Sequence, residues 1–93
     1  MNHYGAMARR HWARWLPGRY ATISDPERFF AELGMRASDR IAELADGFAG
    51  DQPPGEGYLE RVGRLGQARR QAEEIVLHEM VLLEPEPGAD EVG

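Results

Sequence analysis

Residues 24–57 read SDPERFFAELGMRASDRIAELADGFAGDQPPGEG, and this stretch decides the fold. Its apolar residues recur at intervals of three and four, which is the period of an amphipathic helix: Phe30, Leu33, Ala37, Ile41, Leu44 and Phe48. The prolines and glycines of residues 50–57 cannot continue a helix. The sequence therefore predicts a helix over residues 25–48 that ends in a turn.

The start of this helix carries two alternative signals. Ser24 and Glu27 have the spacing of a capping box, in which each side chain bonds a free backbone N–H at a helix start. Asp25 followed by Pro26 at the first helical position is the alternative. Gly34 lies inside the helix and costs about 1 kcal/mol relative to Ala, unless a close helix contact requires it.

Two further apolar stripes with the helical period flank this element. The first predicts a helix over residues 2–16, which Pro17-Gly18 should end. The second predicts a helix over residues 58–83, with Gly63 and Gly66 weakening its first turns.

Two long helices joined by a short turn pack antiparallel, so residues 25–83 should form a helical hairpin. The expected fold is all-α, a three-helix bundle in which the N-terminal amphipathic helix packs across this hairpin. We expect a single domain over residues 1–84 and a disordered acidic tail over residues 85–93. An apolar face left uncovered by the first helix would be available for a homodimer or another partner.

The composition is that of one ordinary folded domain. Of 93 residues, 42% are hydrophobic and 29% charged, and the absence of Cys excludes disulfides and thiolate metal sites. No apolar run approaches the roughly 18 residues of a membrane helix, so we expect a cytoplasmic protein without a membrane partner.

The net charge of −5 is unevenly distributed along the chain. Residues 1–20 hold four arginines and no acid, whereas residues 21–93 hold all sixteen acids and seven arginines. The asymmetry indicates either a polyanion-binding arm or an internal electrostatic contact between the first helix and the others. The internal contact is favoured for a compact domain.

The residues that carry chemistry do not form a recognisable catalytic pattern. His3, Met7 and His11 share a helix face, but the two histidines are two turns apart, and metal sites usually use histidines one turn apart. No nucleophile motif or phosphate-binding glycine loop is present in the sequence. We therefore expect no enzymatic activity, no cofactor and no bound metal.

The first helix carries the preferred candidates for partner binding. Arginine and tryptophan are enriched at the centres of protein interfaces, and here they alternate as Arg9, Arg10, Trp12, Arg14 and Trp15. The same residues could bind single-stranded nucleic acid, or the tryptophans could belong to the core. The acidic remainder of the chain makes a protein partner the better expectation than direct nucleic-acid binding.

An acidic face on the second helix is the alternative site. Glu32, Asp39, Glu43 and Asp46 are consistent with one broad helix face, and proteins that mimic DNA use such stripes in place of phosphates. Arginines are interleaved with these acids at helix-pairing distances, which favours a mixed, solvated face.

The tripeptide Phe48-Ala49-Gly50 stands near the central turn of the predicted hairpin. In this feature, and in its size, acidity and lack of Cys, the chain resembles the WXG100 secretion family, which has Trp-x-Gly at that place. The resemblance implies a secreted helical hairpin. The chain departs from the family in its Trp-rich first helix and in lacking a Tyr-containing signal after the hairpin.

A second resemblance rests on short sequences distributed over most of the chain. They are Met1-Asn2-His3-Tyr4-Gly5-Ala6, His11-Trp12, Leu16-Pro17, Arg19-Tyr20, Asp25-Pro26 and Gly57-Tyr58-Leu59. In these the chain resembles small uncharacterised proteins encoded on actinobacterial integrated elements and prophages. The resemblance implies an accessory or inhibitory protein of a mobile element, with a DNA-processing or defence enzyme as partner.

Overall fold

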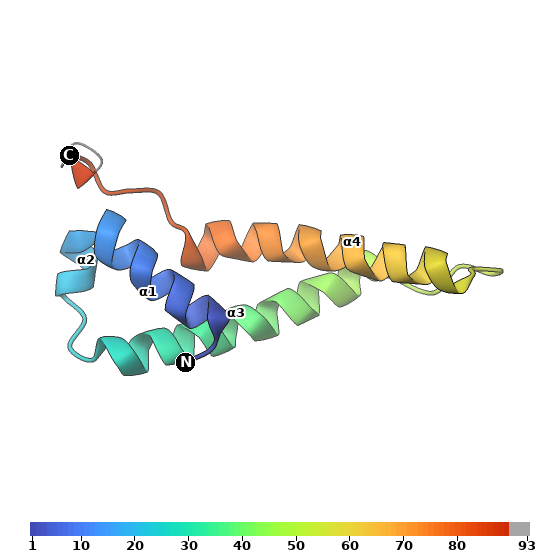
Figure 1. The fold of residues 1–93 in the computed structure, drawn as a ribbon, viewed down its shortest axis with the longest axis horizontal. Helices are drawn as coiled ribbons and strands as arrows, with labels where there is room; N and C mark the ends of the chain where they lie inside the picture. Colours follow the sequence, from blue (N-terminus) through green and yellow to red (C-terminus); the bar gives the residue numbers. More distant parts are fainter. Residues whose placement is uncertain (90–93) are drawn as a thin grey trace.

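The computed structural model describes residues 1–89, and every regular element in that range is a helix (Figure 1). The predicted all-α class is therefore confirmed. The elements in chain order are α1 (His3–Trp15), α2 (Pro17–Ala21), α3 (Pro26–Ala49), α4 (Tyr58–Val76) and a π-helix, η1 (Leu77–Val81). None of the helices in this part of the chain is long and apolar enough to cross a membrane.

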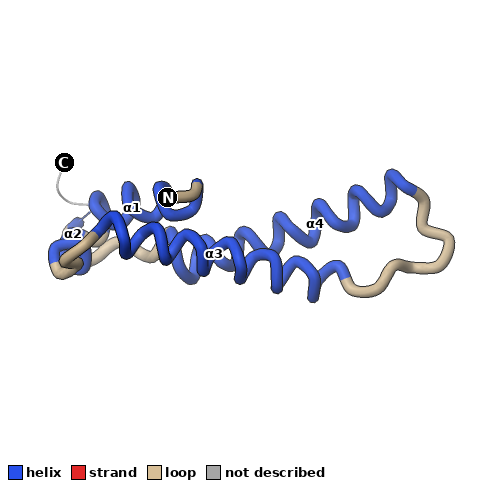
Figure 2. The backbone as a smooth tube through the Cα atoms, turned by 90° about the horizontal axis from the view of Figure 1, so that it is seen from below, coloured by secondary structure: helices blue, strands red, loops and turns tan. Residues whose placement is uncertain are grey.

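The molecule is elongated, 54 by 28 by 16 Å, with α3 and α4 running antiparallel along its length (Figure 1). α1 packs against α3 and η1. It lies at the end of the hairpin where α3 starts and η1 ends, opposite the turn between α3 and α4. In Figure 2, α3 and α4 separate toward the turn that joins them. The main cluster of buried side chains comprises Tyr4, Ala8, Trp12, Leu16, Phe30, Leu33, Ala37, Ile41, Ala72, Val76 and Val81.

The helix starts follow the local signals in the sequence. The Asn2 side chain accepts a hydrogen bond from the Gly5 N–H at 2.9 Å and begins α1. α3 begins at Pro26 with Asp25 as its cap, so the structure selects this start over the capping box. Pro17 does not end the helical region but opens α2, because proline is tolerated in the first turn, where no N–H is needed.

Two glycines bring α1 and α3 close together. A Cβ added at Gly34 would lie 2.7 Å from the backbone nitrogen of Gly5, and one added at Gly5 would collide with the carbonyl oxygen of Phe30. The close helix contact explains why glycine occupies Gly34 despite its helix cost.

The third predicted helix is shorter and less regular than expected. α4 ends at Val76, and the next five residues widen into η1, whose last carbonyl belongs to Val81. Carbonyls at a helix end lack an intrahelical donor. The Trp12 indole Nε1–H donates to this carbonyl at 3.0 Å in a buried contact.

Residues 82–89, called here the C-terminal strap, pass beside α1 and α2 (Figure 1). Residues 85–89, the first part of the tail expected to be disordered, make specific contacts in this structure and include the buried Ala89. The remainder of that predicted tail, residues 90–93, lies outside the described residues.

The strap is held mainly through Glu86. Its backbone N–H donates to the Trp15 carbonyl at 2.9 Å. Its carboxylate accepts hydrogen bonds from the N–H groups of Gly18 and Arg19, each at 2.9 Å. Glu86 thus satisfies two free donors in the first turn of α2, a helix with no side-chain cap at its own N-cap position.

Candidate interaction site at the open end of the hairpin

The end of the hairpin farthest from α1, residues 48–66, is called here the open end. The Arg64 guanidinium reaches the carbonyl oxygen of Ala49, the last residue of α3, at 2.5 Å. The first turns of α4 therefore extend past the end of α3 and lie beside the turn (Figure 2). No second helix of the described chain runs alongside these turns.

Large apolar side chains are exposed on this extension of α4 and on the turn that follows it. The exposed fraction is 79% for Tyr58, 51% for Val62 and 42% for Leu65, and the spacing of these residues puts them on one helix face, called here the α4 stripe. Leu59 beside the stripe is 81% exposed, and Phe48 at the end of α3 is 42% exposed. Contiguous exposed apolar side chains commonly mark a site of interaction.

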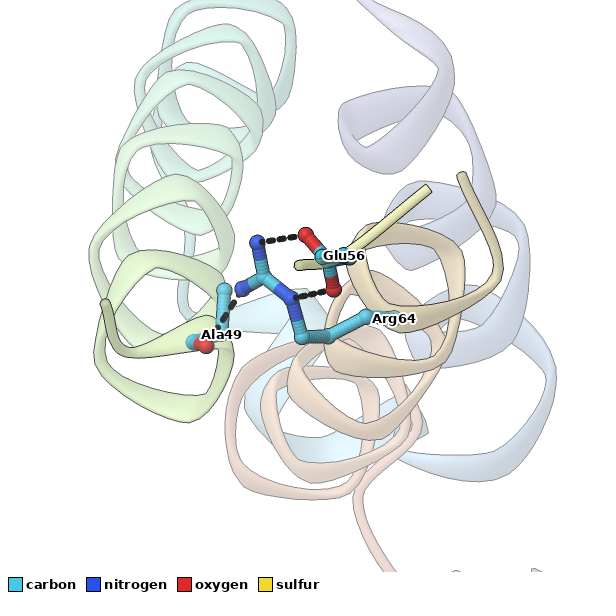
Figure 3. Close-up of polar contacts among 3 residues, drawn as sticks. All are labelled: Ala49, Glu56 and Arg64. Atoms are coloured by element: carbon cyan, nitrogen blue, oxygen red, sulfur yellow. Dashed lines mark hydrogen bonds and ion pairs between the residues drawn. The ribbon is translucent and has the colours of Figure 1, made fainter. Parts of the chain in front are cut away.

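A polar clasp fixes the geometry of the open end (Figure 3). Arg64 Nε donates to one carboxylate oxygen of Glu56 at 2.7 Å, and Arg64 Nη2 donates to the other at 3.1 Å. With the bond to Ala49, this guanidinium ties the turn, α3 and α4 together. Bidentate arginine–carboxylate pairs are among the more specific polar contacts, so the clasp orders the turn.

The clasp is partly buried and changes the acidity of its members. The Glu56 side chain is 4% exposed and that of Arg64 is 22% exposed. The hydrogen bond from Arg64 lowers the pKa of Glu56 below its ordinary value of 4.5, although burial opposes the change. The same bond raises the pKa of Arg64, so both groups stay charged at neutral pH.

A shallow hollow of about 260 Å³ lies beside the clasp. The residues lining it come from the end of α3 and the middle of α4: Phe48, Arg64, Gln67, Ala68 and Gln71. Phe48 of α3 therefore lies level with residues 64–71 of α4, which shows how far the two helices are offset along their length.

The structure separates the two tryptophans of the predicted α1 site. Trp12 is 5% exposed and packs against Phe29 and Phe30, so its side chain is unavailable to a partner in this conformation. Trp15 is half-buried, with the Arg14 guanidinium 4.2 Å from its ring centroid. The sequence interpretation that left Trp12 as a core residue is the one the structure supports.

The arginines of α1 are partly used in internal contacts. Arg9 Nε donates to the Tyr20 hydroxyl at 3.4 Å, and Arg14 donates to the Ala89 carbonyl at 3.3 Å. Arg10 is exposed. The five predicted residues of this helix therefore do not form one exposed surface.

The four acids of the alternative site, Glu32, Asp39, Glu43 and Asp46, are all exposed on α3. Glu32 pairs with Arg28 at 3.2 Å and Glu43 with Arg40 at 3.7 Å. Two of the acids are thus partly neutralised by neighbours on the same helix, and surface pairs of this kind contribute little to stability.

The α4 stripe was not among the candidates predicted from the sequence. Its periodicity continues that of the core residues Ala72 and Val76, so the pattern does not distinguish the exposed turns of the helix from the buried ones. Whether a stripe is covered depends on where the neighbouring helix ends, which periodicity does not report. Leu59 is apolar but lies off the stripe, and it was the local signal in the sequence that these turns carry exposed apolar side chains.

Within residues 1–89, no group of three His, Asp or Glu side chains is arranged to hold a metal ion. No protein-family model matches this chain, and no curated protein or solved structure is similar enough to count as a match.

Proposed function

We propose that this chain is a small non-catalytic interaction module of the helical-bundle type that docks on a protein partner through the open end of its hairpin. The observation that carries the proposal is the exposed α4 stripe, whose residues Tyr58 and Val62 lie on turns of α4 that extend beyond α3. The other half of the molecule, which contains α1, the strap and most of the buried side chains, serves as the scaffold that presents this end.

Three properties of the open end suit docking. Its apolar side chains supply the burial that drives association, at about 25 cal/mol per Å². Tyr58 is of a residue type enriched at interface centres. The clasp of Arg64 and Glu56 orders the turn in advance, which reduces the entropy lost on binding.

The proposal is tested by affinity capture from the native host with two matched variants. Val62→Glu places a charge on the α4 stripe, and we expect it to reduce capture at least tenfold. Met35→Glu makes the same chemical change at a 64% exposed site on α3 outside the open end, and capture should be unchanged. Circular dichroism confirms that both variants are folded. Equal capture by Val62→Glu and the parent chain would refute the proposal.

The same experiment includes the α1 surface predicted from the sequence. Arg10 is exposed and, within residues 1–89, its side chain makes no hydrogen bond, so Arg10→Glu changes the surface and leaves the contacts of Arg9 and Arg14 intact. Loss of capture by Arg10→Glu alone would transfer the docking role to α1.

The acidic face of α3 supports the competing function, a DNA mimic that inhibits a nucleic-acid enzyme, because its four acids are exposed together. Substituting Asp39 and Asp46 by Asn would then abolish capture, and binding would weaken steeply with salt. Docking through the α4 stripe predicts weak salt dependence. The resemblance to proteins of mobile elements makes DNA-processing and defence enzymes the first partners to test.

A further inference from the structure

We propose that a second copy of this chain covers the open end, with the two α4 helices antiparallel about a two-fold axis between residues 63 and 64. The inference rests on the proposed function, because it names the partner of the same surface. It accounts for an apolar stripe on the part of α4 that α1, α2 and α3 leave uncovered.

The exposed face of α4 is self-complementary in this register. Tyr58, Val62, Leu65 and Arg69 follow at intervals of four, three and four, the spacing of a coiled-coil seam. The two-fold places Val62 opposite Leu65 of the second copy, and Tyr58 opposite Arg69. A guanidinium against a tyrosine ring is a favourable cation–π contact, so the ends of the seam also match.

Arg69 is already oriented on the side of α4 that faces α1. Its Nη2 donates to the Tyr4 hydroxyl at 3.3 Å. The α4 stripe therefore lies on the side of the hairpin where α1 begins, and a helix of the second copy would lie on that side, nearer the turn.

Charge does not drive this pairing. Residues 58–70 hold four arginines and one acid, a charge of +3, and the two-fold axis sets this segment against the same segment of the second copy. The association therefore rests on the apolar seam, and added salt should not weaken it.

The available area predicts a weak dimer. Twelve residues of α4 span about 18 Å, and with the adjoining end of α3 the face is roughly 20 Å wide. Such a face covers roughly 360 Å² per copy, and the total of about 700 Å² lies at the low end of weak or transient interfaces. We therefore expect a dissociation constant of roughly 10–100 μM.

Sedimentation velocity of the full chain from about 2 to 500 μM tests self-association. We expect conversion from monomer to dimer across this range, at least a tenfold weaker dimer for Tyr58→Ser, and an unchanged dimer for Met35→Glu. Tyr58 is 79% exposed, so its removal leaves the monomer folded. A chain that remains monomeric at 500 μM, or a dimer indifferent to Tyr58→Ser, overturns the proposal.

The antiparallel register is tested by disulfide trapping, since the chain has no cysteine of its own. A Val62→Cys chain mixed with a Leu65→Cys chain should form the mixed disulfide dimer faster than either forms its own. Faster formation of the two symmetric disulfides would overturn this register.

The two proposals fail differently. A monomeric chain whose capture of another protein is still abolished by Val62→Glu overturns self-association and leaves docking through the open end standing. If the α4 variants retain both self-association and capture of the partner, both proposals are overturned.

Discussion

The glycines within the helices differ in whether neighbouring atoms leave space for a side chain. At Gly34 the position of an added Cβ is occupied by α1, through Gly5 and the Asn2 side chain. At Gly63, none of the residues the structure describes places an atom within 4 Å of an added Cβ outside the helix's own backbone. The same residue type therefore permits close helix packing at one position and only weakens the helix at the other.

We expect opposite effects from alanine at these two sites. Gly34→Ala should lower the free energy of unfolding by about 1–3 kcal/mol, because it forces α1 away from α3. Gly63→Ala should raise it by about 1 kcal/mol, because alanine favours a helix over glycine. Urea unfolding of both variants at one protein concentration measures the difference, and a stabilised Gly34→Ala would contradict the packing described here.

The clasp of the open end should respond to acid in a predictable direction. Because the pKa of Glu56 is lowered in the folded chain, its contribution to stability is complete above about pH 4.5 and disappears as the pH falls through the lower, folded-state pKa. NMR titration of the Glu56 carboxyl should give a midpoint below 4.5 that rises toward 4.5 in Arg64→Gln. An unchanged midpoint in that variant would show that Arg64 is not the cause.

At the scale of elements, the strap and α1 hold each other in place. η1 presents the Val81 carbonyl to Trp12, and the strap then returns along α1 to cap α2 through Glu86. A short helix such as α2 is unstable alone. It depends on contacts from the other end of the chain.

Removing the strap's cap should therefore destabilise the scaffold. Glu86→Ala leaves two N–H groups of α2 without a partner, and we expect a loss of about 1 kcal/mol in the free energy of unfolding. Glu84→Ala, at an exposed site on the same strap, is the control and should have little effect. Equal stability of the two variants would indicate that the cap contributes nothing.

The sequence predicted these elements where local signals act and missed them where distant contacts decide. The helices around residues 2–16 and 25–48 follow from their periodicity and their Asn2 and Asp25 caps, each within a residue or two. The strap was missed because an acidic, proline-containing segment indicates disorder unless a partner such as the start of α2 is known. The exposed α4 stripe was missed because it depends on the relative heights of α3 and α4.

At the scale of the whole molecule, the two ends of the hairpin differ in how they are completed. One end contains α1, α2, the strap and nearly all of the buried side chains. The other end holds two helices, a polar clasp and exposed apolar residues. Exposed apolar side chains gathered at one end of a bundle are typical of a surface that docks on a partner.

Hydrogen exchange along the chain tests this account most directly. It compares the dilute, free chain with the bound state, whether the partner is a captured protein or a second copy at high concentration. The account predicts that residues 58–66 gain protection on binding while α1 and the middle of α3 are nearly unchanged. Protection gained around Arg10 or along residues 32–46, with none in residues 58–66, would contradict it.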